Sequence, residues 1–174
     1  RNASQPTTVS ATFSYFWGRK NSFMRPILLA LLFAVVSSTA EAQLADPIKW
    51  TFSARKIDAK TYEVRMLATI QTNWHLYSQT QPKDAVINPT AILFNKNPLV
   101  SLDGKAKEVG KMELYSDKKL GISANQYSGQ VEFVQKVRLK AAAKTNVSGT
   151  VEFQTCDDKK CLPPKKVSFN LALN

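Results

Sequence analysis

The sequence lacks the hydrophobic pattern of helices along most of its length. Downstream of residue 42, no stretch places apolar residues at helical spacing over three turns, and the alanine-rich run at 141–144 is too short for a helix. Internal repeats and low-complexity segments are also missing. These absences argue against a helical or repeat protein, and the length suits a single domain.

The sequence has only one long apolar run, Ile27–Val36, whereas a membrane-spanning helix needs about 20 residues. Met24-Arg25 precedes this run, and small residues ending in Ala40-Glu41-Ala42 follow it. A positive start, a short apolar centre and an Ala-x-Ala end are typical of a secretory signal peptide. We therefore predict a signal peptide over residues 24–42, cleaved after Ala42, rather than a retained membrane anchor.

Residues 1–23 lie upstream of a segment that must stand at a nascent N-terminus, and the chain does not begin with methionine. We interpret them as translated upstream sequence that is not native to the protein. Residues 43–174 are then the mature domain, without a further apolar run and without a cysteine at the cleavage site for a lipid anchor. We expect this domain to be exported, with no stable membrane insertion.

The net charge is strongly positive, but no nucleic-acid-binding motif accompanies it. The formal charge is +11, and residues 1–42 carry four basic side chains and one acidic one, which leaves +8 for the rest. The lysines are spread over every segment rather than gathered in one block. We expect no nucleic-acid partner, because the charge suits a solvated surface that also favours acidic partners.

Alternation of apolar and polar side chains predicts strands instead of helices. Short strands with turn signals about every ten residues are typical of an all-β sandwich. The predicted strands are Ile48–Ser53, Tyr62–Ile70, Trp74–Ser78, Thr90–Phe94, Leu99–Leu102, Ala106–Met112, Gln130–Leu139, Asn146–Thr155 and Lys166–Leu173.

The connections between these strands follow from turn residues. Lys56–Lys60 reads as a hairpin turn, and Asp103-Gly104 is a tight-turn dipeptide. Gln79–Asn88 is polar and has a proline near each end, so it is predicted to be a loop. Leu114–Asn125 has weak periodicity and mixed charges, and is predicted to be an excursion loop.

The two cysteines, Cys156 and Cys161, connect two of the predicted strands. In an exported protein, two cysteines most simply form one disulfide. If they end facing strands as a non-hydrogen-bonded pair, their Cα atoms lie about 4.5 Å apart, at the short end of what a disulfide accepts. The hydrophilic residues Asp157–Lys160 would then form an exposed hairpin loop.

Redox exchange explains this cysteine pair better than stabilisation does. The loop it closes is much shorter than a 15-residue loop, whose closure is worth about 3 kcal/mol, and it joins strands that the hairpin already holds. An exposed disulfide in a tight loop is open to thiolate attack. Lys159 and Lys160 favour a thiolate at Cys161, whereas the aspartates beside Cys156 oppose one. A structural disulfide stays open as an alternative.

Metal binding is a third interpretation and needs more ligands than the two thiolates. The other candidates for Cu(I) are His75, the only histidine, and the methionines Met66 and Met112. A histidine beside Trp74 is more often a packed or hydrogen-bonded aromatic, and Met66 falls in a predicted strand. We therefore expect no metal and no cofactor.

Two motifs resemble a known family. Val151–Pro164 holds a strand, two cysteines around a short polar loop, an apolar residue and Pro-Pro before a final strand. It resembles the cysteine hairpin of the N-terminal periplasmic domain of DsbD, the thiol:disulfide interchange protein, and of standalone disulfide bond corrector proteins. Trp74–Ser78 is similar to the family's aromatic stretch, and the similarity extends over Ile48–Leu173.

The resemblance implies an immunoglobulin-like β-sandwich that relays reductant. The family's domain receives electrons from a thioredoxin-like partner and passes them to disulfide isomerases or cytochrome c maturation proteins. By position, Cys156 and Cys161 would be the redox pair, with Cys161 entering the mixed disulfide. Tyr77 and His75 would pack near the pair, and the region from Tyr115 to Gly121 matches the family's shielding cap loop.

The sequence also departs from the family pattern. The cysteines have one fewer intervening residue than in the best-known DsbD, and the cap lacks a phenylalanine, so Tyr115 or Leu120 would serve in its place. No transmembrane or thioredoxin domain follows, so we expect the electron donor to be a separate protein, such as a membrane donor. The predicted activity is thiol:disulfide interchange of the protein-disulfide reductase type, and the alternative is a non-catalytic binding module of the same fold.

Overall fold

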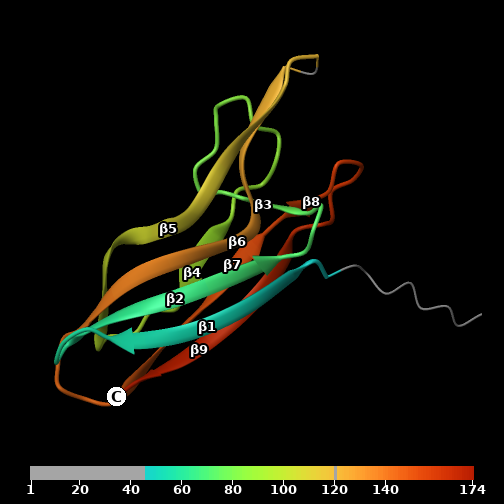
Figure 1. The fold of residues 1–174 in the computed structure, drawn as a ribbon. Coiled ribbons are helices and arrows are strands. Elements are labelled where there is room, and N and C mark those ends of the chain that lie inside the picture. Colours follow the sequence, from blue (N-terminus) through green and yellow to red (C-terminus); the bar gives the residue numbers. More distant parts are fainter. Residues whose placement is uncertain (1–45, 120) are drawn as a thin grey trace, which may run out of the picture. The chain divides into compact units, whose positions relative to one another are not determined.

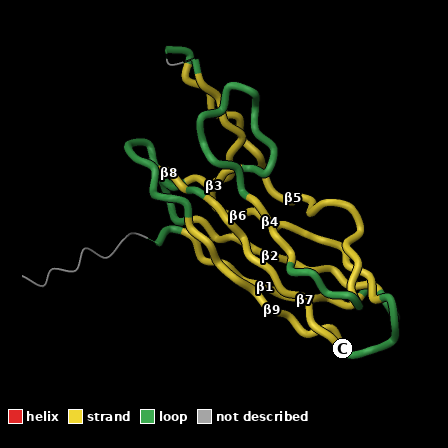
Figure 2. Tube along the Cα trace, turned by 180° about the vertical axis from the view of Figure 1, so that it is seen from behind, coloured by secondary structure: helices red, strands yellow, loops and turns green. Residues whose placement is uncertain are grey.

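The computed structural model describes residues 46–119 and 121–174, and every regular element among them is a β-strand (Figures 1 and 2). The predicted signal peptide and Leu120 lie outside the described residues. None of the described segments forms a helix long and apolar enough to cross a membrane. The strands are β1 (Ile48–Lys56), β2 (Thr61–Ile70), β3 (His75–Tyr77), β4 (Ala91–Phe94), β5 (Val100–Asp117), β6 (Ile122–Leu139), β7 (Thr145–Phe153), β8 (Thr155–Cys156) and β9 (Lys165–Leu173).

The strands form two antiparallel sheets. The larger sheet has the order β1-β2-β6-β3-β8, with β5 paired to the other side of β6, and the smaller has the order β4-β7-β9. The fold is thus an immunoglobulin-like β-sandwich, as the alternation of side chains and the family resemblance predicted. β6 is long enough to pair with β2 over its second half and with β3 near Tyr127.

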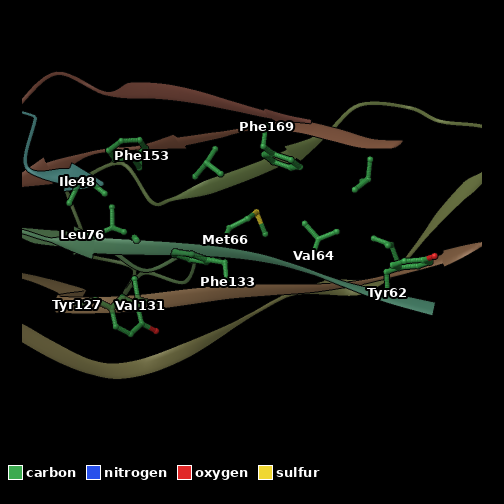
Figure 3. Packing of buried hydrophobic residues seen from close by; sticks show 14 of the residues in the cluster. Ile48, Tyr62, Val64, Met66, Leu76, Tyr127, Val131, Phe133, Phe153 and Phe169 are labelled. Carbon is green, nitrogen blue, oxygen red and sulfur yellow. The ribbon is translucent and has the colours of Figure 1, made fainter. Parts of the chain in front are cut away.

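The core lies between the two sheets and is built by alternate residues of each strand. In β2, every second residue from Tyr62 to Ile70 is buried, and β6 contributes a matching row. Figure 3 shows Phe153 and Phe169 of the smaller sheet facing Met66 and Phe133 of the larger one. Burying a side chain of this size contributes about 1.5–3 kcal/mol relative to leaving it exposed, so these facing rows stabilise the pairing of the two sheets.

Two predictions about β5 and β6 were wrong. Asp103-Gly104 is not a hairpin turn: Gly104 has a φ of 68°, but β5 continues past it and pairs with β6 on both sides of a register shift. Leu114–Asn125 is not an irregular excursion either, because Leu114 pairs with Asn125 and Tyr115 with Ala124. These residues project beyond the core, so no face is consistently buried, and the apolar alternation that signals a strand is absent.

The predicted loop at Gln79–Asn88 is confirmed, and it is held against the β5–β6 hairpin (Figures 1 and 2). The Gln81 side chain donates to the Ser78 and Asn125 carbonyls and accepts from the Asn125 amide. The Glu108 carboxylate accepts from the Ser78 hydroxyl at 2.7 Å and from the Gln79 amide at 2.6 Å. These bonds tie the start of the loop to the strands that flank it.

Glu108 also accepts a hydrogen bond of 2.6 Å from the hydroxyl of Tyr127. Burial and this bond to a carboxylate raise the pKa of Tyr127 well above its usual range. The phenol therefore stays protonated and keeps donating at physiological pH. One carboxylate thus joins β5, β6 and the loop.

Close packing of the smaller sheet depends on Gly149 of β7. An added Cβ there would lie 2.7 Å from the Phe169 ring and still closer to the Leu93 carbonyl oxygen. We expect Gly149→Ala to lower the free energy of unfolding by about 1–3 kcal/mol, because the neighbouring strands must move apart. Urea denaturation measures this, with the exposed Ser168→Ala as the control expected to stay within about 0.5 kcal/mol of wild type. Equal stability of Gly149→Ala and wild type would contradict this packing.

Candidate functional site

The cysteines form the expected disulfide at the end of a two-stranded turn. Cys156 ends β8 and is bonded to Cys161 across a Cα–Cα distance of 4.0 Å. The Asp157 amide donates to the Lys160 carbonyl and the Leu162 amide donates to the Thr155 carbonyl, each at 2.9 Å. These bonds flank the cysteines, which therefore face each other as a non-hydrogen-bonded antiparallel pair, as the sequence predicted.

The turn between the cysteines is organised by Asp157. Its Oδ1 accepts hydrogen bonds from the amides of Lys159 at 2.8 Å and Lys160 at 2.7 Å. These bonds, followed by the positive charges of the same lysines, hold the pKa of Asp157 below its usual range. The carboxylate is thus an acceptor that closes the turn and brings the cysteines together.

The two cysteines differ in exposure. Cys156 is 4% exposed and belongs to a small apolar cluster with Tyr77 and Ala124, against which Ile87 packs. Cys161 is exposed to solvent. An external reactant can therefore approach Cys161, whereas Cys156 is covered by protein.

A cleft of about 600 Å³ lies beside the disulfide. Its walls come from four segments that are distant in sequence: β3, the outer part of the β5–β6 hairpin, the loop after β3 and the cysteine turn. His75, Tyr77 and Tyr115, all singled out from the sequence, line this cleft together with both cysteines. Leu120, the fourth such residue, is outside the described part of the chain.

The tyrosines contribute to the cleft in different ways. Tyr77 is 6% exposed, and its burial, followed by the nearby Tyr115, raises the pKa of its hydroxyl. Tyr115 is 47% exposed and stands on β5 opposite Ala124, another cleft residue. Tyr77 is therefore buried in the cluster that contains Cys156, whereas Tyr115 is exposed to solvent in the same cleft.

Sequence reasoning missed the contribution of the loop after β3. Val86 and Ile87 line the cleft, and Val86 is 75% exposed. The available signal was a pair of aliphatic residues inside an otherwise polar, proline-bounded segment. The exposed Val86 side chain adds apolar surface to the cleft that also contains Cys161.

His75 is placed directly across the sheet from Cys156. The two residues are register partners between β3 and β8. The His75 Nδ1 lies 3.0 Å from the Ser128 hydroxyl oxygen and 3.2 Å from Gln126 Nε2. Its Nε2 lies 3.7 Å from Oδ1 of Asp158 in the cysteine turn.

The copper alternative gains no further ligand from the fold. Met66 is fully buried in the core, whereas Met112 is 51% exposed on β5. Residues 46–119 and 121–174 contain no group of three histidine, cysteine, aspartate or glutamate side chains arranged to hold a metal ion. In the structure both sulfurs are engaged with each other in the disulfide.

Comparison with known proteins places these features in context. The family model described as "Thiol:disulfide interchange protein DsbD, N-terminal" matches residues 40–173. No curated protein is significantly similar to the sequence.

Two solved structures share the fold. The N-terminal periplasmic domain of ScsB from Proteus mirabilis has a TM-score of 0.53 and 16% identity over 73% of this chain. This chain spans about half of that structure, covering 47% of it. The reduced DsbD N-terminal domain from Neisseria meningitidis has a TM-score of 0.50 and 16% identity, covering 79% of this chain and 95% of that one. At these identities the likeness shows the fold alone.

The turn analysis predicts how Asp157 affects the disulfide. We expect Asp157→Ala to shift the equilibrium with glutathione toward the dithiol, because a looser turn holds the thiols together less often. Asp157→Asn is the matched control, since its amide oxygen accepts the same two bonds. The pKa of Asp157 is lower in the folded protein than its usual value of 3.8. The stabilisation of the turn by this carboxylate is therefore present above pH 3.8 and is lost as the pH falls through the lower pKa of the folded state. Equal equilibria for the alanine and asparagine variants would contradict this role.

Proposed function

Because the chain belongs to the family of the N-terminal domain of the thiol:disulfide interchange protein DsbD, we propose that it relays electrons by thiol–disulfide exchange between thioredoxin-like proteins. The observation that carries this proposal is the disulfide itself, with one exposed and one buried cysteine beside an open cleft. No cofactor is needed, because the exchanging electrons stay on sulfur throughout.

The exposure of the cysteines assigns their roles in this proposal. A donor thiolate attacks Cys161, forming a mixed disulfide and releasing Cys156 as a thiolate. The donor's second thiolate then attacks the donor sulfur that is bonded to Cys161. This step frees Cys161 and leaves the domain as a dithiol. When the domain donates electrons, Cys161 attacks the acceptor's disulfide and Cys156 resolves the mixed disulfide.

The cleft supports a protein partner for these steps. Val86 and Tyr115 are exposed apolar or aromatic side chains on the same cleft as Cys161. In water such groups favour association with an apolar surface, and a redox partner must bring its own sulfur within bonding distance of Cys161. Tyr115 would also shield the disulfide between encounters.

The proposed location is the periplasm. One solved structure with this fold is described as a periplasmic domain, and the apolar run before the described residues has the features of a cleaved signal peptide over residues 24–42. The mature domain would comprise residues 43–174. In this proposal a membrane protein supplies electrons, and disulfide isomerases or cytochrome c maturation proteins accept them.

The reduction potential distinguishes this relay from a binding module with a structural disulfide. Disulfides that only stabilise exported proteins have potentials below about −300 mV. We expect the Cys156–Cys161 potential to lie above about −300 mV, since Cys161 is open to exchange. Equilibration with dithiothreitol and glutathione buffers measures it, and a much lower value would refute the relay.

Trapping a mixed disulfide tests the roles of the two cysteines. We expect Cys156→Ala to form a lasting mixed disulfide with a thioredoxin whose single exposed active-site cysteine has been activated with thionitrobenzoate. Cys161→Ala should react far more slowly, because Cys156 is 4% exposed. Release of thionitrobenzoate gives both rates. Faster trapping by Cys161→Ala would reverse the assignment.

A further inference from the structure

The proposed exchange places a negative charge on the buried sulfur of Cys156, where it is disfavoured. When a thiolate attacks Cys161, the electron pair of the breaking S–S bond moves to the sulfur of Cys156. Cys156 is 4% exposed and packs with Tyr77, Ala124 and Ile87. Burial among apolar groups disfavours a thiolate, so Cys156 would be a slow leaving group unless a neighbour offsets its charge.

His75 is the neighbour placed to do this. Directly opposite residues of an antiparallel pair project from the same face of a sheet, with their Cβ atoms about 4.5–5.5 Å apart. His75 and Cys156 are such partners, and both line the same cleft. His75 is also the only histidine of the chain.

We propose that His75, as imidazolium, offsets the charge of the Cys156 thiolate during thiol–disulfide exchange, a role that rests on the proposed function. The step balances without a proton transfer. The attacking thiolate loses its charge as its bond to Cys161 forms, and the charge appears on Cys156 beside the imidazolium. In the reverse step the same cation favours the Cys156 thiolate that resolves the mixed disulfide.

The surroundings offer hydrogen-bond partners to both states of the ring. As imidazolium, His75 donates from Nδ1 to the Ser128 hydroxyl at 3.0 Å and points Nε2 at the Asp158 carboxylate at 3.7 Å. As neutral imidazole, Nδ1 accepts from the Gln126 amide at 3.2 Å. Both ring nitrogens of His75 therefore have a polar partner in either charge state.

The other titratable and charged groups around His75 belong to side-chain types other than histidine. On β6 the facing groups, Gln126 and Ser128, are neutral. The remaining ones are Tyr77 on β3, Tyr115 on β5, Glu113 on β5 within 3.5 Å of the Ser128 hydroxyl, and Asp157, Asp158, Lys159 and Lys160 in the turn. Side chains of these types ordinarily titrate outside pH 5–8, where histidine titrates. While the cysteines form a disulfide they do not titrate, and the His75→Gln variant tests whether a change in this range depends on the imidazole.

The test is the pH dependence of reduction of the oxidised protein by dithiothreitol. The rate constant is expressed per dithiothreitol thiolate, and the dithiol product is counted after acid quenching and alkylation. We expect it to rise about three- to tenfold from pH 8 to pH 5 in wild type, because a better-stabilised thiolate leaves faster. In His75→Gln, which keeps a polar side chain, the profile should be flat.

Lys159→Gln is the matched control. It removes a positive charge from the same cleft without removing the imidazole, so it should keep the wild-type rise. A flat wild-type profile, or a rise that persists in His75→Gln, would overturn the proposal, and the wild-type result needs no variant to fold. Failure of the relay itself would appear separately, as a potential below about −300 mV or as absent trapping.

Discussion

The burial of Leu76 holds the site together. β3 has three residues, and its central one, Leu76, is fully buried in the main core while pairing with Tyr127 of β6 and Thr155 of β8. Because side chains alternate along a strand, anchoring Leu76 in the core turns His75 and Tyr77 to the opposite face. That face carries Cys156 and the cleft, so the burial of Leu76 places His75 and Tyr77 beside the disulfide.

The same arrangement separates the two sulfurs by environment. The larger sheet covers Cys156, whereas Cys161 follows the turn and stands in solvent. An exchange reaction needs an accessible sulfur for the partner and a protected one that re-forms the bond. The short turn held by Asp157 connects an accessible sulfur, that of Cys161, to a protected one, that of Cys156.

The loop after β3 completes the cleft, and Glu108 explains how it keeps its position. This carboxylate binds the loop through Ser78 and Gln79 and binds β6 through Tyr127. Val86, further along the loop, is left exposed beside the cysteine turn. Hydrogen bonds at the base of the loop thus hold the outer part in place, where the exposed Val86 side chain would contact a partner protein.

The local sequence pattern is enough to predict the sheet character of the domain and the cysteine hairpin. Alternation in β2, β6, β7 and β9 is strong because one face of each strand is buried, and the disulfide is local, closing over four intervening residues. The other features depend on contacts between segments that are distant in the sequence. The outer β5–β6 hairpin buries few apolar side chains and so leaves a weak pattern, and Gly104 bulges instead of turning because β6 pairs with β5 on both sides of it. Likewise, the pairing of His75 with Cys156 and the place of Val86 and Cys161 on one cleft depend on distant segments coming together, which no local spacing encodes.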